Sequence, residues 1–148
     1  SFSAPLTVNQ TTSGSQFTTS TLPATRMWWR VRANDSSGAP GAWSSQRHWH
    51  ERQDELVYVL EGEATLVTDE GETTLSAGMV AGFPAGSGNG HHIVNRSNAI
   101  VRLLEVGTRS PGGADACDYP DIDMVLPAGA DRYFHRDGTP YPKHDRRT

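Results

Sequence analysis

Short apolar runs, rich in β-branched and aromatic residues and separated by turn-forming residues, are the feature that most constrains the fold of this chain. The runs recur at the spacing of roughly 8–12 residues that is typical of all-β domains. No segment of useful length repeats its apolar residues with the period of a helix. The 15 glycines and 9 prolines supply turns between the runs. The chain is therefore predicted to be all-β, a sandwich or a barrel.

Strands are expected in the apolar runs, with a hairpin turn at Asp69, Glu70 and Gly71. The expected strands cover residues 27–32, 43–50, 56–60, 64–68, 73–75, 79–83, 91–95 and 100–106. A length of 148 residues is that of one domain. We expect an extended N-terminal arm over residues 1–26, a single β domain over 27–140 and an irregular C-terminal tail over 141–148. One or two short strands are also expected beyond residue 110, in the region that includes the apolar run 124–126.

Charge and hydropathy exclude several classes of partner. The 13 Lys and Arg residues and 17 Asp and Glu residues give a net charge of −4, which is unsuited to holding a nucleic acid or an anionic membrane surface. No apolar run approaches the roughly 18 residues of a membrane span, and no signal peptide is recognisable. A cytoplasmic protein is expected, although Asn-x-Ser/Thr triplets at Asn9, Asn34 and Asn95 keep secretion as an alternative. The single cysteine, Cys117, cannot form an internal disulfide and is expected to be a bystander.

Three histidines and one glutamate form the candidate functional site. His48 and His50 are two residues apart on an expected strand, so both imidazoles project from one face, about 7 Å apart. Glu55 starts the next strand after a polar turn, and His91 starts another strand after a Gly-rich loop. Neutral imidazoles with a carboxylate suit one divalent Mn, Fe, Ni, Co or Zn ion and leave room for water or substrate. The expected metal ligands are therefore His48, His50, Glu55 and His91.

The same residues fall into two spaced motifs. His48-x-His50 is followed after four residues by Glu55, and after six more by Gly62. Gly78 is followed after five residues by Pro84-x-Gly86, after four by His91 and after three by Asn95. Together these motifs resemble the two motifs of the cupin superfamily, small β-barrels with a metal at the centre. The family usually has two residues between that Pro-x-Gly and the histidine, so the chain departs from the pattern at residues 87–90.

The resemblance implies a jelly-roll barrel, also called a double-stranded β-helix, and allows several functions. The favoured one is a metal-dependent enzyme of a small oxygenated metabolite (an organic acid, a sugar or an aromatic compound) with lyase, decarboxylase or isomerase chemistry. In it Glu55 and His91 are the catalytic candidates, and Glu55 is both a ligand and a possible base. A metal-dependent dioxygenase is one alternative. A non-catalytic module that binds a metal or small ligand is another.

Strand alternation predicts which side chains face the interior. Gln46, Val57, Val59, Ile93 and Asn95 are expected inside with the ligands, whereas Arg47, Trp49, Tyr58 and Leu60 are expected outside. His92 is expected on the opposite face from His91, in a structural role. Because an apolar outer surface of Trp49, Tyr58 and Leu60 needs a cover, we expect a homodimer.

Other residues carry weaker expectations. Gly62, Gly71, Gly78 and Gly86 are expected at turns with positive φ. Trp28, Trp29, Trp43 and Phe83 are candidates for the barrel mouth or the core. Arg30, Arg32 and Arg102 are candidates for binding a substrate carboxylate, with none favoured. His135 and His144 are expected to face solvent.

Overall fold

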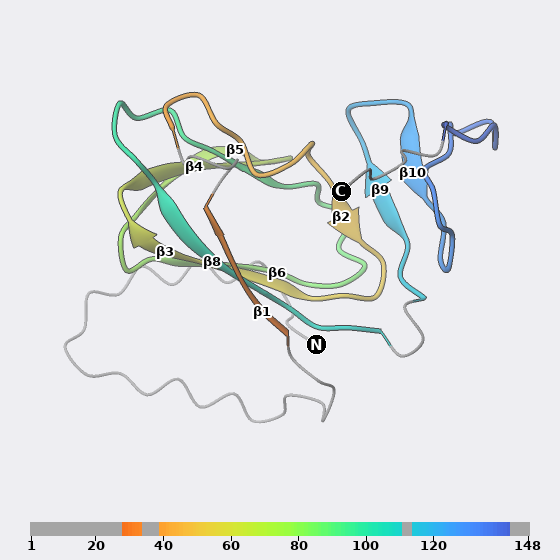
Figure 1. Ribbon diagram of the computed structural model, residues 1–148, viewed down its shortest axis with the longest axis horizontal. Helices are drawn as coiled ribbons and strands as arrows, with labels where there is room; N and C mark the ends of the chain where they lie inside the picture. Colours follow the sequence, from red (N-terminus) through yellow and green to blue (C-terminus); the bar gives the residue numbers. More distant parts are fainter. Residues whose placement is uncertain (1–27, 34–38, 111–113, 143–148) are drawn as a thin grey trace.

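The computed structural model describes residues 28–33, 39–110 and 114–142 and, within 28–33, the course of the backbone. The described residues form three antiparallel sheets joined by turns and loops (Figure 1). One sheet has the strand order β1-β8-β3-β6, the second β5-β4-β7 and the third β10-β9-β2. The all-β prediction is confirmed, and the antiparallel sheets agree with the predicted jelly-roll barrel.

The strand boundaries follow the apolar runs of the sequence closely. They are β1 (Trp28–Ala33), β2 (Trp49–His50), β3 (Glu55–Glu61), β4 (Glu63–Thr68), β5 (Gly71–Ser76), β6 (Val80–Phe83), β7 (His92–Val94), β8 (Arg102–Gly107), β9 (Cys117–Tyr119) and β10 (Met124–Leu126). The hairpin expected at residues 69–71 joins β4 to β5, where Thr68 pairs with Gly71. Two short strands, β9 and β10, lie beyond residue 110, as expected.

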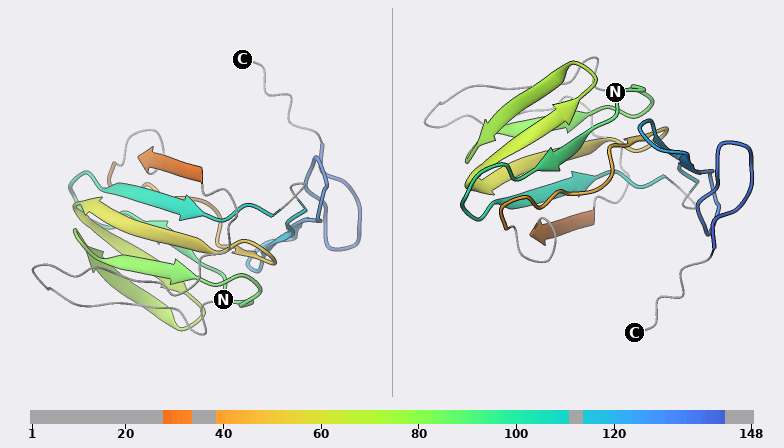
Figure 2. Two further views of the ribbon diagram at one scale, coloured as in Figure 1. Left: turned by 90° about the horizontal axis from the view of Figure 1, so that it is seen from below. Right: turned by 90° about the horizontal axis from the view of Figure 1, so that it is seen from above.

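The first two sheets face each other as layers and enclose the core (Figure 2). Alternate residues of each strand point between the layers, because successive side chains of a strand project to opposite faces. The core consists of Val57, Val59, Ala64, Leu66, Leu75, Ala81, Phe83, Ile93, Val101 and Leu103. The third sheet lies at one end of this sandwich and is built largely from the C-terminal residues (Figures 1 and 2).

The predicted alternation holds on the regular strands and fails before them. Val57, Val59, Ile93 and Asn95 are buried, and Tyr58 and Leu60 are 37% and 47% exposed. Gln46, however, is exposed, so its predicted interior position is wrong. Of the strand expected over 43–50, the structure has Trp49–His50 as β2 and isolated bridges at Trp43 and His48. The chain bends between the two bridges, so the alternation of side chains does not continue across residues 44–47.

Gly62 shows why a turn of this fold requires glycine. Its φ is +84°, and a Cβ there would lie 2.5 Å from the carbonyl oxygen of Ile100. The expected positive φ is also present at Gly71, Gly78 and Gly86. Each of these glycines therefore lies at a turn in the left-handed region, which L side chains adopt at a cost.

The structure tests some of the expectations about glycosylation, membranes, partners and location. Asn95 is fully buried and donates from Nδ2 to the carbonyl of Ala99, so this triplet is not an accessible glycosylation site. Asn9, Asn34, the N-terminal arm and His144 lie outside the described residues. Within those residues, no helix is long and apolar enough to cross a membrane. The homodimer and the cytoplasmic location stay predictions.

Candidate metal centre

A two-residue bridge brings His48 and His91 together from distant parts of the chain. His48 N donates to His91 O at 3.1 Å, and His91 N donates to His48 O at 2.9 Å. Residues that exchange both hydrogen bonds in an antiparallel pair project their side chains to the same face. The centroids of the two imidazole rings therefore lie 5.1 Å apart, on the same side of the bridge.

Glu55 lies at the centre of the three predicted histidines. Its Oε2 atom is 3.0 Å from His91 Nε2, 3.6 Å from His50 Nε2 and 3.8 Å from His48 Nε2. The carboxylate comes from the start of β3, where Glu55 pairs with Phe83 of β6 and Gly107 of β8. The structure thus brings together the four residues that the sequence predicts as metal ligands.

Hydrogen bonds at the opposite nitrogen orient two of the imidazoles. His48 Nδ1 lies 2.9 Å from the carbonyl of Gln46 and 3.1 Å from Ser45 Oγ. His50 Nδ1 lies 2.5 Å from Asp115 Oδ2, and that carboxylate also accepts from the backbone N of Arg52. A carbonyl or carboxylate acceptor fixes the proton on Nδ1 and leaves the lone pair on Nε2. Both Nε2 lone pairs are therefore available on the side where Glu55 lies.

His91 is held by stacking. Its ring lies on Phe83 with centroids 3.6 Å apart and an interplanar angle of 1°. His91 Nδ1 is buried and, among the described residues, has no hydrogen-bond partner. Phe83, a candidate for the mouth or the core, is therefore a core residue that supports a predicted ligand.

The electrostatics keep the donor atoms in the forms that a cation needs. Burial lowers the pKa of His48 below its ordinary value, a shift that the negative charge of Glu55 partly offsets. Burial would raise the pKa of Glu55, but the hydrogen bond with His91 and the electrostatic contributions of His50, His91 and His48 outweigh it and lower that pKa to about 2. At neutral pH the cluster thus has a neutral imidazole at His48 and an ionised carboxylate at Glu55.

These observations fit a resident metal ion. Ligand atoms of His48, Glu55 and His91 all lie within 4.8 Å of one another, and His50 Nε2 approaches the same carboxylate oxygen. Three imidazole nitrogens and one carboxylate oxygen form a borderline-to-hard donor set for a divalent transition metal. The chemistry of the donors leaves several metals open, so the site is assigned as a possible His/Glu metal site without a specific ion.

Cys117 lies closer to this cluster than the sequence indicated. Ligand atoms of His48, His50 and Cys117 also lie within 4.8 Å of one another, because β9 pairs Cys117 with His50. Burial raises the pKa of the Cys117 thiol to about 12. Since the thiolate is the form that ligates metals, a protonated thiol is a poorer ligand than the Glu55 carboxylate. The set containing Glu55 is therefore the better candidate.

A cavity of about 500 Å³ opens in front of the cluster. His48, His50, Glu55 and His91 all line it. Its other polar lining residues are Ser44, Ser45, Gln53, Glu105, Arg109, Tyr119 and Tyr133. The candidate ligands therefore face a space large enough for a small organic molecule.

The C-terminal sheet supplies part of this site, which sequence reasoning missed. Tyr119 of β9 stacks on His48 with centroids 5.6 Å apart, and Tyr133 contacts Tyr119 edge-on at 5.8 Å. Asp115 holds His50 from the segment just before β9. Residues of such a short, weakly patterned segment carry no periodicity that would place them near the histidines. Asp115 and Tyr119 can be assigned to the site only once the pairing of β9 with β2 is known.

Arg47 joins the segments around the site from the outer side, as its predicted outward position requires. Its guanidinium donates to Asp121 at 2.6 and 2.8 Å and to the carbonyl of Gly90 at 3.3 Å, and it pairs with Asp69. Gly90 allows this approach, because a Cβ there would lie 2.7 Å from Pro120 Cγ. The neighbour of His48 is thus tied to the residue before His91.

The arginine candidates have a different outcome. Arg102 is exposed and pairs with Glu61, and it is absent from the lining of the large cavity. The side chains of Arg30 and Arg32 lie outside the described part of the structure. Arg109, which the sequence did not single out, lines the cavity and donates to Gln53 Oε1 at 3.2 Å.

His92 and His135 lie away from the cluster. His92 contacts Trp43 edge-on at 6.0 Å, and its Nδ1 lies 3.1 Å from the carbonyl of Ser45. Its position opposite His91 agrees with a structural role. His135, expected to face solvent, is partly buried against Tyr141, with ring centroids 3.8 Å apart, because the C-terminal residues fold back on themselves.

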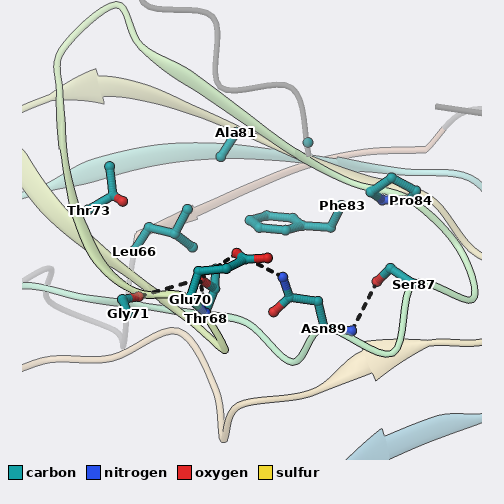
Figure 3. A pocket seen from close by; sticks show the side chains of 11 residues that line it. Leu66, Thr68, Glu70, Gly71, Thr73, Ala81, Phe83, Pro84, Ser87 and Asn89 are labelled. Carbon is teal, nitrogen blue, oxygen red and sulfur yellow. Dashed lines mark hydrogen bonds between the residues drawn. The ribbon is translucent and has the colours of Figure 1, made fainter. Parts of the chain in front are cut away.

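A second, smaller cavity of about 110 Å³ lies between the β4–β5 hairpin and the loop that follows β6 (Figure 3). Asn89 of that loop donates to Glu70 Oε2 at 3.0 Å and accepts from the backbone N of Asp69 at 3.0 Å. Figure 3 shows Asn89 and Glu70 directed toward each other below the ring of Phe83. The two extra residues of the second motif therefore belong to a loop that is fastened to the hairpin.

Comparison with known proteins agrees with this fold. A family model described as a cupin domain matches residues 37–107. A sugar phosphate isomerase of the cupin superfamily from Silicibacter pomeroyi is 44% identical with a TM-score of 0.64, over 70% of this chain and 66% of that one. A provisionally assigned sugar phosphate isomerase from Acidithiobacillus ferrooxidans is 27% identical with a TM-score of 0.59, over 74% of this chain and 65% of that one. This chain thus spans slightly less than two thirds of either protein. No curated protein matches it.

The two motifs and the facing sheets agree with these similarities. The match to the family model ends at residue 107, at the end of β8, so β9 and β10 of the third sheet lie beyond the matched residues. The chain belongs to the cupin superfamily.

Proposed function

We propose that this protein is a metal-dependent isomerase that interconverts the aldose and ketose forms of a small sugar phosphate. The observation that carries the proposal is the position of Glu55 Oε2, 3.0–3.8 Å from three imidazole Nε2 atoms on the wall of a cavity of about 500 Å³. The similarity to a sugar phosphate isomerase at 44% identity supports this reaction among the several that a cupin site allows.

The metal would be held by His48, His50, Glu55 and His91. A divalent ion bound there supplies Lewis-acid stabilisation of the negative charge that develops on the substrate oxygens. The protein's own contribution is to position those ligands, through Asp115 behind His50 and the Gln46 carbonyl behind His48.

Aldose–ketose interconversion also needs a group that moves a proton between neighbouring carbons. Glu105 lines the cavity and lies opposite Val57 in the β3–β8 pairing, whereas Glu55 lies opposite Gly107. The Cα atoms of Glu55 and Glu105 are therefore diagonal neighbours across one ladder, roughly 7–8 Å apart. We assign Glu105 the transfer between carbons: it removes the proton from the hydroxyl-bearing carbon and returns it to the former carbonyl carbon, while the hydroxyl proton passes to the former carbonyl oxygen. Because Glu55 is committed as a ligand, a separate carboxylate is better suited to this role.

The test is turnover by the full chain loaded separately with Mn, Fe, Co, Ni or Zn. A panel of aldose and ketose phosphates in D₂O is followed by ¹H NMR, because proton transfer through Glu105 places solvent deuterium on the product carbon. Glu105→Gln is expected to lower kcat about 100-fold or more with metal content unchanged. Oxygen consumption with aromatic or keto acids would instead indicate a dioxygenase. Metal binding without turnover of any substrate would indicate a binding module.

A further inference from the structure

The wall of the large cavity has an ordered series of side chains along β3 and β8. Two pairs of the ladder line the cavity, Glu55 opposite Gly107 and Val57 opposite Glu105, and Gln53 lies beside Arg109 just beyond the strand ends. The backbones stay hydrogen-bonded beside this contact, since Thr108 N donates to Asp54 O at 2.9 Å. Successive inward positions of a strand are roughly 7 Å apart. Glu55, a candidate metal ligand, therefore lies between Arg109 with Gln53 on one side and the Glu105 carboxylate on the other.

Arg109 is placed to bind an anion. Arg109 lines the cavity and is exposed, and its Nη1 donates to the neutral amide oxygen of Gln53 at 3.2 Å. Among the described residues, no ion pair joins Arg109 to a carboxylate. Four of the five guanidinium N–H donors are therefore left for a ligand or for water.

Other residues of the cavity wall add further hydrogen-bond donors near Arg109. Gln53 is 8% exposed, and because its Oε1 accepts from Arg109, its amide NH₂ remains a donor. Tyr119 and Tyr133 line the same cavity. Each tyrosine hydroxyl is an O–H donor. A group with three oxygens and a net negative charge would meet several donors here, as a phosphate monoester requires.

We propose that Arg109, oriented by Gln53, binds the phosphate group of the substrate beside the metal ligands. This inference rests on the proposed function, which supplies the carbonyl end of the same molecule. Because Gln53 precedes Glu55 by two residues, their Cα atoms are at most about 7 Å apart, a separation that the two ends of a short-chain sugar phosphate can span. The pair of Arg109 and Gln53 thus selects for phosphorylated over neutral sugars.

The test uses ligands that have no aldehyde or ketone group, so that binding is measured without turnover. The metal-loaded full chain is titrated by calorimetry with ribitol 5-phosphate, ribitol and ribonate, in the wild type, Arg109→Gln and Arg109→Lys. Arg96→Gln is the matched control, because Arg96 is exposed, pairs with Glu72 and does not line the cavity. Metal content is measured for each variant.

The wild type and the control are expected to bind ribitol 5-phosphate about 10- to 100-fold more tightly than ribitol. Arg109→Gln is expected to lose most of that preference at unchanged metal content, and Arg109→Lys to keep part of it, because lysine retains the charge but not the fork of donors. An unchanged preference in Arg109→Gln, no preference in the wild type, or a preference for ribonate would each overturn the phosphate assignment.

A parallel turnover assay separates this inference from the proposed function. Isomerisation that is insensitive to Arg109→Gln would overturn the phosphate subsite and leave the isomerase in place. An Arg109-dependent preference for the phosphate, without turnover of any sugar phosphate, would support the subsite and contradict the isomerase.

Discussion

His50 donates from Nδ1 to Asp115 Oδ2 at 2.5 Å, although the two residues are 65 positions apart in the chain. The contact joins a predicted metal ligand to a segment beyond residue 107, where the match to the cupin family model ends. The Asp115 side chain is 9% exposed and the His50 side chain 18%, so water competes little for this bond. The segment that leads into β9 therefore forms part of the site.

Asp115→Asn is expected to weaken metal binding about 10- to 100-fold. The amide is a weaker acceptor than the carboxylate, so the His50 ring loses its fixed tautomer and orientation. The measurement is the metal dissociation constant by competition with a chelator of known affinity. Asp118→Asn is the control, because Asp118 pairs with Arg136 outside the cluster. Equal affinities in the wild type and Asp115→Asn would show that Asp115 does not position His50.

The double variant His48→Ala with His50→Ala is expected to contain no stoichiometric metal. It removes two of the three imidazoles around Glu55, and a metal that binds the folded state raises the melting temperature by linkage. Metal content by plasma mass spectrometry and the shift of melting temperature on adding metal are the measurements. His92→Ala is the control and is expected to keep its metal, since His92 faces Trp43. A full metal complement in the double variant would remove the proposed site.

The stability of the metal-free protein is expected to fall on acidification. The folded-state pKa of His48 lies below 6.5, so unfolding takes up a proton once the pH drops below that value. The folded-state pKa of Glu55 is about 2, against an ordinary value of 4.5, so its contribution is present above pH 4.5 and is lost as the pH falls toward 2. Both shifts lower the free energy of unfolding in acid.

This pH dependence is measured by urea unfolding in chelator, in steps from pH 8 to the lowest pH at which the protein folds. His48→Ala is expected to reduce the slope below pH 6.5, and Glu55→Gln the slope below pH 4.5. Parallel curves for all three proteins would mean that these groups have no shifted pKa values in the folded state.

Gly90→Ala is expected to destabilise the protein by about 1–3 kcal/mol. The new Cβ would lie 2.7 Å from Pro120 Cγ, so the loop before His91 and the C-terminal sheet would have to separate. Gly82→Ala is the matched control, because a Cβ there meets nothing within 4 Å. The free energy of unfolding in urea checks the difference, and similar values for both variants would contradict the close contact.

The regular strands were predictable because burial imposes a period of two on their side chains. Val57 and Val59 are buried while Tyr58 and Leu60 are exposed, as alternation requires. Gln46 departs from that rule because the chain bends between its bridge at Trp43 and β2. The alternation of side chains predicts burial only within a regular strand. The third sheet consists of strands of two or three residues, which are too short for that pattern to be recognised.

The sequence by itself determined the β class, the order of the strands in the chain and the spacing of His48, His50, Glu55 and His91. These follow from local rules, since strand periodicity and the two motifs act over a few residues. Only the tertiary structure decided that Asp115 supports His50, that Phe83 stacks on His91, and that Arg109 rather than Arg102 lines the cavity. Such contacts depend on which strands pair and at which register, and that choice is set by the packing of the whole core.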